Sequence, residues 1–402
     1  MGPTMSETAK YRSQWSRRFA IVSILFLISW GVAILAGGPR RMEVYLGLYG
    51  FVFHMIFSKG YALLPTYFNR SLRPHWLPFV HFPLTVGGVA GLAFASIPEL
   101  QLYAWILPLA ATAWMVGVVC FVGGFVWTVR GNITGRETAT GNHNRHRRQT
   151  DRFANLFMPI ALGYLFIGSY LHLSRVTWLP NPLGGGPPVV SHLLAVGTAT
   201  LLIYAIGFRL LPRFFRSTPP RGAVVLVLPL AAIAPLGLAS SFSSGTPFLV
   251  FAIMQMVAMI GFTIAIVTMA VRAPSIRIGL NAVVIGSIAG LFGMGLGLWF
   301  IMGSVTAGSV MAHIRLNLMG FVGLTIIGVV YQFYPPTAAT LPGSTNRTAG
   351  GSIGAICSGI VLEVSGLLAG SELLVEIGQF ILFIGIVIFA YLVGGVLYSR
   401  RG

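Results

Sequence analysis

The sequence predicts an all-α integral membrane protein, a polytopic bundle of transmembrane helices. Its residues are 55% hydrophobic and only 8% charged, whereas soluble domains carry roughly 25% charged residues. The apolar residues also form long runs of about 20 residues, the length that a helix needs to cross a bilayer. The net charge of +18 does not indicate nucleic-acid binding, because the cations lie in the connections between those runs, where they orient the chain in the membrane.

We expect about twelve spans that form a single membrane domain, residues 1–402, within the bilayer of the plasma membrane. A polar and basic segment precedes the first run, and no convincing small-residue cleavage site follows it, so we expect this run to be retained as a span. The expected spans are 19–37, 43–65, 77–97, 102–129, 154–172, 188–212, 223–243, 247–271, 278–302, 308–334, 350–370 and 374–398.

Charge placement predicts that both termini lie in the cytoplasm. With twelve spans and a cytoplasmic N-terminus, the outer side holds only Arg40, Arg41, Arg175 and Arg315. Lys59 falls within the second span, and the rest of the 26 Lys and Arg residues lie on the cytoplasmic side. Cytoplasmic loops carry an excess of Lys and Arg, so one span more or fewer would reverse the later loops and remove this asymmetry.

Three spans share a design that predicts three four-helix units. The second, sixth and tenth spans each have a proline near the inner end, at Pro65, Pro212 and Pro335. These prolines are 147 residues (212 − 65) and 123 residues (335 − 212) apart, and each interval holds four spans. Because internal repeats are common in membrane bundles, we expect pseudo-repeats at about 19–129, 154–271 and 278–398.

Three histidines and two arginines are predicted to lie in one layer toward the outer leaflet. His172 ends the fifth span, His192 begins the sixth and His313 begins the tenth, while Arg175 and Arg315 lie at similar depth. Neutral imidazole is a common ligand of haem iron, copper and zinc, and a guanidinium fork matches a carboxylate such as a haem propionate. These five residues are candidate cofactor-binding residues, with His192 and His313 as metal ligands. The alternative is that they cap helix ends or bond to neighbouring helices.

Ionisable side chains deep within the spans form a second group of candidates. His54 lies halfway along the second span, Lys59 follows five residues later, and Glu363 lies within the eleventh span. An ionisable group at mid-membrane is costly and usually faces the bundle interior or a polar cavity. His54 is therefore a third candidate metal ligand, and His54, Lys59 and Glu363 are candidates for a proton path. The alternative for His54 is a neutral imidazole that bonds to the backbone of another helix.

Subunit I of the haem–copper oxidases has a tenth helix that resembles the stretch beginning at His313, HIRLNLMGFVGLTIIGVVYQFYP. The stretch beginning at His192, HLLAVGTATLLIYAIGFRLLPRF, is similar to the NnrS family. Members of that family are membrane proteins that contain haem and copper and are linked to nitric oxide metabolism. The resemblance covers the whole chain as an architecture of twelve spans in three arcs. It implies a haem-binding protein that acts in oxygen or nitrogen-oxide metabolism, with copper as a further cofactor and His313 as the proximal haem ligand. An enzyme of this type would be an oxidoreductase with an electron donor at its outer face or in a respiratory complex.

Several ligands of the oxidase pattern are missing from this sequence. Arg315 stands where the tenth helix of the family has its second histidine. The second span has no histidine at its outer start, and its histidine, His54, lies about three turns deeper. The seventh span has no His-His pair. The chain is therefore similar to a simplified member of the superfamily.

Two other functions stay open on the sequence alone. A proton-coupled secondary transporter would also have twelve spans and internal repeats, with His54 and Glu363 as its mid-membrane groups. A structural subunit with vestigial metal sites would account for the missing oxidase ligands. A test for bound haem distinguishes the haem-binding protein from both the transporter and the structural subunit.

Overall fold

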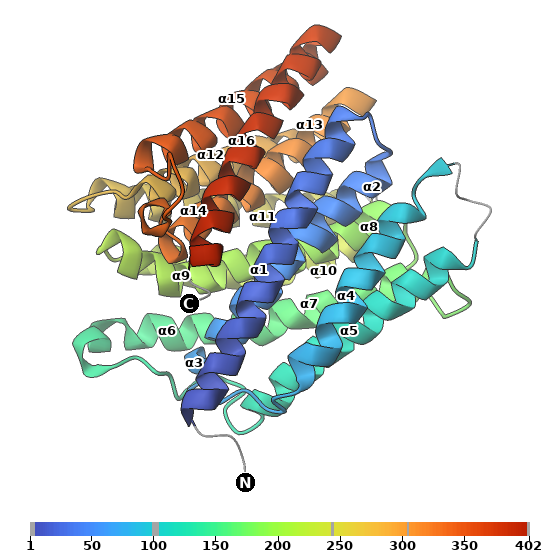
Figure 1. The fold of residues 1–402 in the computed structure, drawn as a ribbon. Helices are drawn as coiled ribbons and strands as arrows, with labels where there is room; N and C mark the ends of the chain where they lie inside the picture. The colour runs from blue at the N-terminus through green and yellow to red at the C-terminus, as the bar shows by residue number, and fades with distance from the viewer. Residues whose placement is uncertain (1–4, 99–103, 243–244, 304, 400–402) are drawn as a thin grey trace. The chain divides into compact units, whose positions relative to one another are not determined.

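The computed structural model describes residues 5–98, 104–242, 245–303 and 305–399, and within these ranges the secondary structure is helical, with no strand. Eleven helices of the described chain are long and apolar enough to cross a membrane (Figure 1). The composition therefore predicted the fold class correctly. Parts of the expected spans 102–129 and 223–243, and both ends of the chain, lie outside the described residues.

The helices follow the expected spans closely. The segment 278–302, for example, was expected as a span and forms one helix of the same length. The elements are α1 (Met5–Leu35), α2 (Arg40–Val44), η1 (Tyr45–Val52), α3 (Phe53–Tyr67), α4 (Leu77–Phe94), α5 (Ile106–Val129), η3 (Asn142–Arg147), α6 (Arg148–Asn155), α7 (Phe157–Ser174), α8 (Pro187–His192), η4 (Leu193–Thr200), α9 (Leu201–Phe215), α10 (Arg221–Ser240), α11 (Thr246–Val271), α12 (Ile278–Met302), α13 (Ala307–Arg315), η5 (Leu316–Gly323), α14 (Leu324–Phe333), η6 (Pro336–Ala338), α15 (Asn346–Ala369) and α16 (Glu372–Ser399).

The second expected span, 43–65, is helical but is not among the eleven helices that are long and apolar enough to cross a membrane. It consists of α2, η1 and α3, and the residues at both junctions keep right-handed helical dihedrals, so the three segments form one continuous helix. His54, Ser58 and Lys59 make this helix more polar than the others. A polar span is tolerated where its polar groups face the bundle interior, and His54 and Ser58 are both fully buried.

Three of the spans contain an eight-residue π-helical segment. These segments are η1, η4 and η5, and they belong to the second, sixth and tenth expected spans. Their first residues are 148 positions (193 − 45) and 123 positions (316 − 193) apart, which nearly repeats the spacing of the three prolines. Short π-helical turns are rare and are found frequently at functional sites.

Polar side chains donate hydrogen bonds to backbone carbonyls in or beside each π segment. His54 Nδ1 lies 2.9 Å from the carbonyl oxygen of Gly50, Thr198 Oγ1 donates to Leu193 O at 3.3 Å, and Asn317 Nδ2 donates to His313 O at 2.8 Å. A widened helical turn disturbs the usual backbone pairing, and water cannot replace a missing donor in an apolar bundle. These side chains therefore stabilise the π segments.

The chain divides into two compact units. Unit 1 comprises Met1–Ser23, Pro39–Arg209 and Leu238–Phe242, and unit 2 comprises Ile24–Gly38, Leu210–Gly237 and Ser243–Gly402. Within unit 1, α4 and α5 pack along one another as an antiparallel hairpin (Figure 1). Within unit 2, α15 and α16 form a second such hairpin, and α12 packs against α11, η5 and α14.

Glycines set the close approach of α15 and α16. A Cβ atom on Gly359 would lie 2.5 Å from Leu382 N, and one on Gly378 would lie 2.4 Å from Glu363 N. Both obstacles are backbone atoms, so no side-chain rotation could relieve them. Small residues are common where two membrane helices approach closely.

Alanine at Gly378 should therefore destabilise unit 2, by about 1–3 kcal/mol for overpacking. The matched control is Gly394→Ala on the same helix, where a Cβ meets nothing within 4 Å. Replacing Gly394 by alanine should be neutral or slightly stabilising, because alanine is the better helix former. Thermal unfolding of both variants in detergent measures the difference, and equal melting temperatures would contradict the proposed role of Gly378.

Candidate functional site

His313 is held on α13 against α12 in unit 2. A capping box begins α13, with Ser309 N donating to Thr306 Oγ1 at 3.1 Å and Thr306 N donating to Ser309 Oγ at 3.0 Å. The half-buried ring of His313 has Nδ1 2.8 Å from Gly293 O. A carbonyl oxygen only accepts hydrogen bonds, so this shorter contact favours a proton on Nδ1 over the 3.3 Å contact that Asn317 Nδ2 makes with the same atom. The ring also lies over Gly297, where a Cβ would come within 2.8 Å of it.

Arg315, two residues farther along, turns to a different neighbour. Its Nε lies 2.9 Å from Glu363 Oε2 and 3.0 Å from Glu363 Oε1, and both side chains are fully buried. Gln379 Nε2 on α16 donates to the same carboxylate at 3.1 Å, and the Trp30 ring lies 5.9 Å from the guanidinium. The structure therefore pairs Arg315, an expected cofactor-binding residue, with Glu363, an expected proton-path residue. It also separates Arg315 from the face that carries His313.

Three other expected cofactor-binding residues lie in unit 1. His192 is half-buried, with Nδ1 2.7 Å from Pro188 O and its ring 5.6 Å from that of Phe242. The buried ring of His172 packs against Tyr45 and Tyr49 at 5.5 and 5.4 Å. Its Nε2 has no hydrogen-bond partner among the described residues.

Arg175 at the end of α7 is exposed, and its Nη1 donates to Gly185 O at 2.6 Å. This bond ties the helix end to the loop that leads into α8. The described hydrogen bonds of Arg175 and His192 go to two different backbone carbonyls, those of Gly185 and Pro188.

His54 is fully buried and forms part of an aromatic cluster in unit 1. Its Nδ1 lies within 3.0 Å of the carbonyl oxygens of Tyr49 and Gly50, which again places the proton on Nδ1. Its ring lies 6.1 Å from Phe19 and 5.8 Å from Phe57. These backbone partners belong to the helix of His54 itself, whereas the alternative weighed from the sequence was a bond to the backbone of another helix.

His81 belongs to the same cluster and was not among the expected site residues. It is fully buried, its Nδ1 lies 2.9 Å from Tyr61 Oη, and its Nε2 has no hydrogen-bond partner in the described part of the chain. Phe57 at 4.5 Å and Phe19 at 5.0 Å flank the imidazole. The sequence did contain a signal, because His81 lies four residues inside the apolar run 77–97, as an ionisable group within a span.

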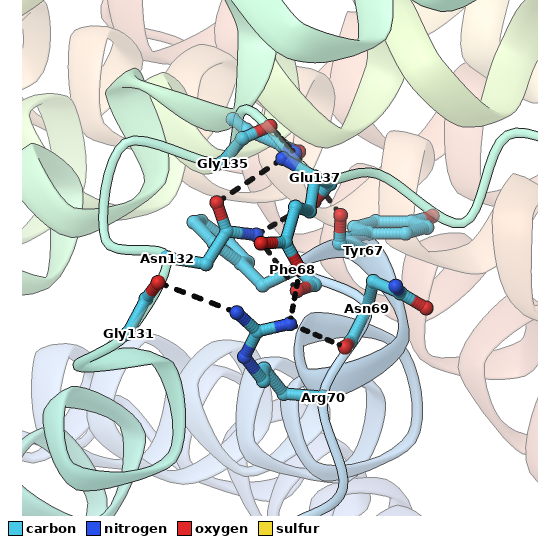
Figure 2. Close-up of polar contacts among 9 residues, drawn as sticks. Tyr67, Phe68, Asn69, Arg70, Gly131, Asn132, Gly135 and Glu137 are labelled. Carbon is cyan, nitrogen blue, oxygen red and sulfur yellow. Dashed lines mark hydrogen bonds and ion pairs between the residues drawn. The ribbon is translucent and has the colours of Figure 1, made fainter.

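A polar network joins the end of α3 to the connection between α5 and η3 (Figure 2). Asn132 Nδ2 donates to Phe68 O at 2.9 Å and to Glu137 O at 2.7 Å, and Glu137 N donates back to Asn132 Oδ1. Arg70 donates to Gly131 O and binds the Glu137 carboxylate at 2.6 Å. The connection is therefore anchored along residues 131–137.

The Arg70–Glu137 pair lies at the surface, outside the spans. The hydrogen bond from Arg70, with its positive charge, lowers the pKa of the Glu137 carboxyl below its usual 4.5. A carboxyl with a lowered pKa in the folded state stabilises that state above the unfolded pKa, and the contribution disappears as the pH falls through the folded pKa. The pair is partly exposed, so its contribution is small.

The anchoring of residues 131–137 should therefore weaken below about pH 4.5. Hydrogen exchange of the Asn132 and Glu137 region, corrected for the intrinsic pH dependence, measures this change. In Glu137→Gln the anchoring should be weaker at neutral pH and should no longer depend on pH in this range. The same pH dependence in the variant would contradict the assignment to Glu137.

We compared the chain with known protein families and with curated proteins and found no relative. No protein-family model matches the chain, and no curated protein matches it. Among the described residues, no group of three or more His, Cys, Asp or Glu side chains lies close enough together to hold a metal ion. The candidate sites are therefore the single histidines, the Arg315–Glu363–Gln379 cluster and the His54–His81–Tyr61 cluster.

Proposed function

We propose that the chain is a haem-binding membrane protein of the haem–copper oxidase and NnrS type, acting in oxygen or nitrogen-oxide metabolism. The observation that carries the proposal is the hydrogen bonding of His192 and His313. In both residues Nδ1 is bonded to a backbone carbonyl, at 2.7 and 2.8 Å. A metal-ligating histidine usually donates its other ring N–H to a carboxylate or a backbone carbonyl, and the Nδ1–carbonyl contacts of His192 and His313 have this form.

The chemistry of these two residues fits an axial haem ligand. Each imidazole is half-buried, and each lies just ahead of a π segment, His192 directly before η4 and His313 three residues before η5. Haem would supply one-electron chemistry toward oxygen or nitrogen oxides. The role of this chain would be to hold the iron, through His313 in unit 2 or His192 in unit 1. The proposal includes copper only as a further cofactor, which a second histidine would bind.

The repeated π segments support the wider architecture implied by the resemblance. Their spacing supports three four-helix units, because it repeats the proline spacing with an independent structural feature. The proposal includes cytoplasmic termini, which the distribution of Lys and Arg supports, and a location in the plasma membrane. An electron donor or respiratory complex would then meet the histidines from the outer face.

Visible spectra of the detergent-purified protein, prepared with haem supply, test this function. We expect a Soret band that shifts on reduction and is lost in His313→Ala, with recovery when imidazole is added to the variant. His146→Ala, in the exposed connection between α5 and α6, is the matched control and should keep the band. A colourless wild-type protein, or a band unaffected by both His313→Ala and His192→Ala, would overturn the proposal.

A proton-coupled secondary transporter is the second candidate, and the buried Arg315–Glu363–Gln379 cluster favours it. Ionisable groups inside a bundle often mark ion or substrate pathways. Proton uptake into proteoliposomes that is lost in Glu363→Gln but survives in His313→Ala would favour this function over haem binding.

A further inference from the structure

We infer that one end of the α4–α5 hairpin is a binding site for the headgroup of an anionic phospholipid. This site is independent of the proposed haem binding and of all the histidines discussed above, and it shares with that proposal only the cytoplasmic orientation of the chain. Its charged residues are Arg18, Arg73 and Arg130, whose side chains are all exposed. Its aromatic residues are Trp76, Phe79 and Trp127, whose solvent-exposed fractions are 58%, 66% and 57%.

Hydrogen bonding brings the two helix ends together. Trp76 is the N-cap of α4, and Arg130 is the C-cap of α5. Arg73 N donates to Thr128 Oγ1 at 3.1 Å, which holds the chain ahead of α4 against the last turn of α5. Close packing continues along the hairpin, since a Cβ on Gly124 would overlap Leu77.

The arginines are placed next to aromatic rings. The Arg130 guanidinium lies 4.0 Å from the centre of the Trp127 ring. The Arg18 guanidinium lies 4.4 Å from the centre of the Trp15 ring, and Trp15 contacts Phe79 edge-on at 6.2 Å. The start of α1 therefore joins the same end of the hairpin, and all of these residues belong to unit 1.

This combination fits a lipid better than a soluble anion. Exposed tryptophans occur at the membrane–water interface, where their rings lie at the level of the headgroups. Arginines beside them can bind a phosphate through two parallel hydrogen bonds. The charge distribution assigns this end of the hairpin to the cytoplasmic leaflet, where anionic lipids attract clustered cations. Glu137, the one acidic residue of the connection 130–141, is already paired with Arg70.

Native mass spectrometry of the full-length protein in a mild detergent tests the site. Equal amounts of phosphatidylglycerol and phosphatidylcholine are added, and we expect the anionic lipid to be retained preferentially. Each arginine should contribute about fivefold to its retention, so Arg18→Gln/Arg73→Gln/Arg130→Gln should lower it by about a hundredfold. The control is Arg136→Gln/Arg145→Gln/Arg152→Gln, which removes three other exposed charges from unit 1.

Two outcomes would overturn the inference. Equal loss of lipid in both triple variants would mean that net charge attracts the lipid and that no local site exists. Displacement of phosphatidylglycerol by millimolar inorganic phosphate or glycerol 3-phosphate would identify a soluble phosphate as the ligand. Thermal unfolding without added lipid should be the same for both triple variants, which separates loss of the site from loss of the fold.

Discussion

Replacing Glu363 by leucine should lower the free energy of unfolding by about 3–5 kcal/mol, the cost of breaking a buried ion pair. Glu363 and Arg315 are both fully buried, at 0% and 1% exposure of their side chains. Without the carboxylate, the Arg315 guanidinium would keep its charge in an apolar bundle, because arginine is not deprotonated in proteins. Denaturant or thermal unfolding of the variant in detergent measures the loss.

The companion variants separate the ion pair from ordinary packing. Arg315→Met should cost less than Glu363→Leu, because the remaining carboxyl can take up a proton and become neutral. The double variant should lose less stability than the sum of the two single losses, since neither charge is left without its partner. Glu376→Leu, at an exposed position of α16, is the control and should change stability by about 0.5 kcal/mol or less. Additive losses in the double variant would contradict the interaction.

The same pair shows the limit of what the sequence predicted. Apolar runs were sufficient to predict the helices, because a bilayer leaves few alternatives to a helix of about 20 residues. They also placed Arg315 in a layer toward the outer leaflet and Glu363 within the eleventh span, both as candidate site residues. The pairing could not be predicted, because 48 residues separate the two, and only the packing of α13 against α15 brings them together.

The candidate histidines were found from the sequence, but their hydrogen-bonding states were not. The positions of His192 and His313 at the start of two similar spans were visible in the sequence. The carbonyl groups that lie against their Nδ1 atoms belong to Pro188 and Gly293, and π segments follow both histidines. Tertiary packing decides both features, so a reading of local composition cannot supply them.

Arg209→Met should strongly destabilise unit 1, by about 3–5 kcal/mol, because it removes three buried hydrogen bonds as well as the charge beside Asp151. Arg209 is 2% exposed, and its guanidinium donates to Asn155 Oδ1, to Tyr67 O at 3.2 Å and to Thr138 Oγ1 at 3.0 Å. Its Nε lies 3.9 Å from the buried Asp151 carboxylate. The side chain therefore connects α9 to α3, to α6 and to the connection before η3. Thermal unfolding and trypsin cleavage within residues 130–148 measure its loss.

Lysine at position 209 should not rescue this network, because one ammonium cannot reproduce the planar fork that reaches Asn155, Tyr67 and Thr138 together. The charge is nevertheless retained, so Arg209→Lys separates hydrogen-bond geometry from the charge that offsets Asp151. We expect trypsin to cleave residues 130–148 faster in Arg209→Lys than in wild type. Arg221→Lys, at an exposed position, should leave stability and cleavage unchanged. A fully stable Arg209→Lys would mean that charge alone holds the network, and the geometry of the guanidinium would then have no part in anchoring the connection.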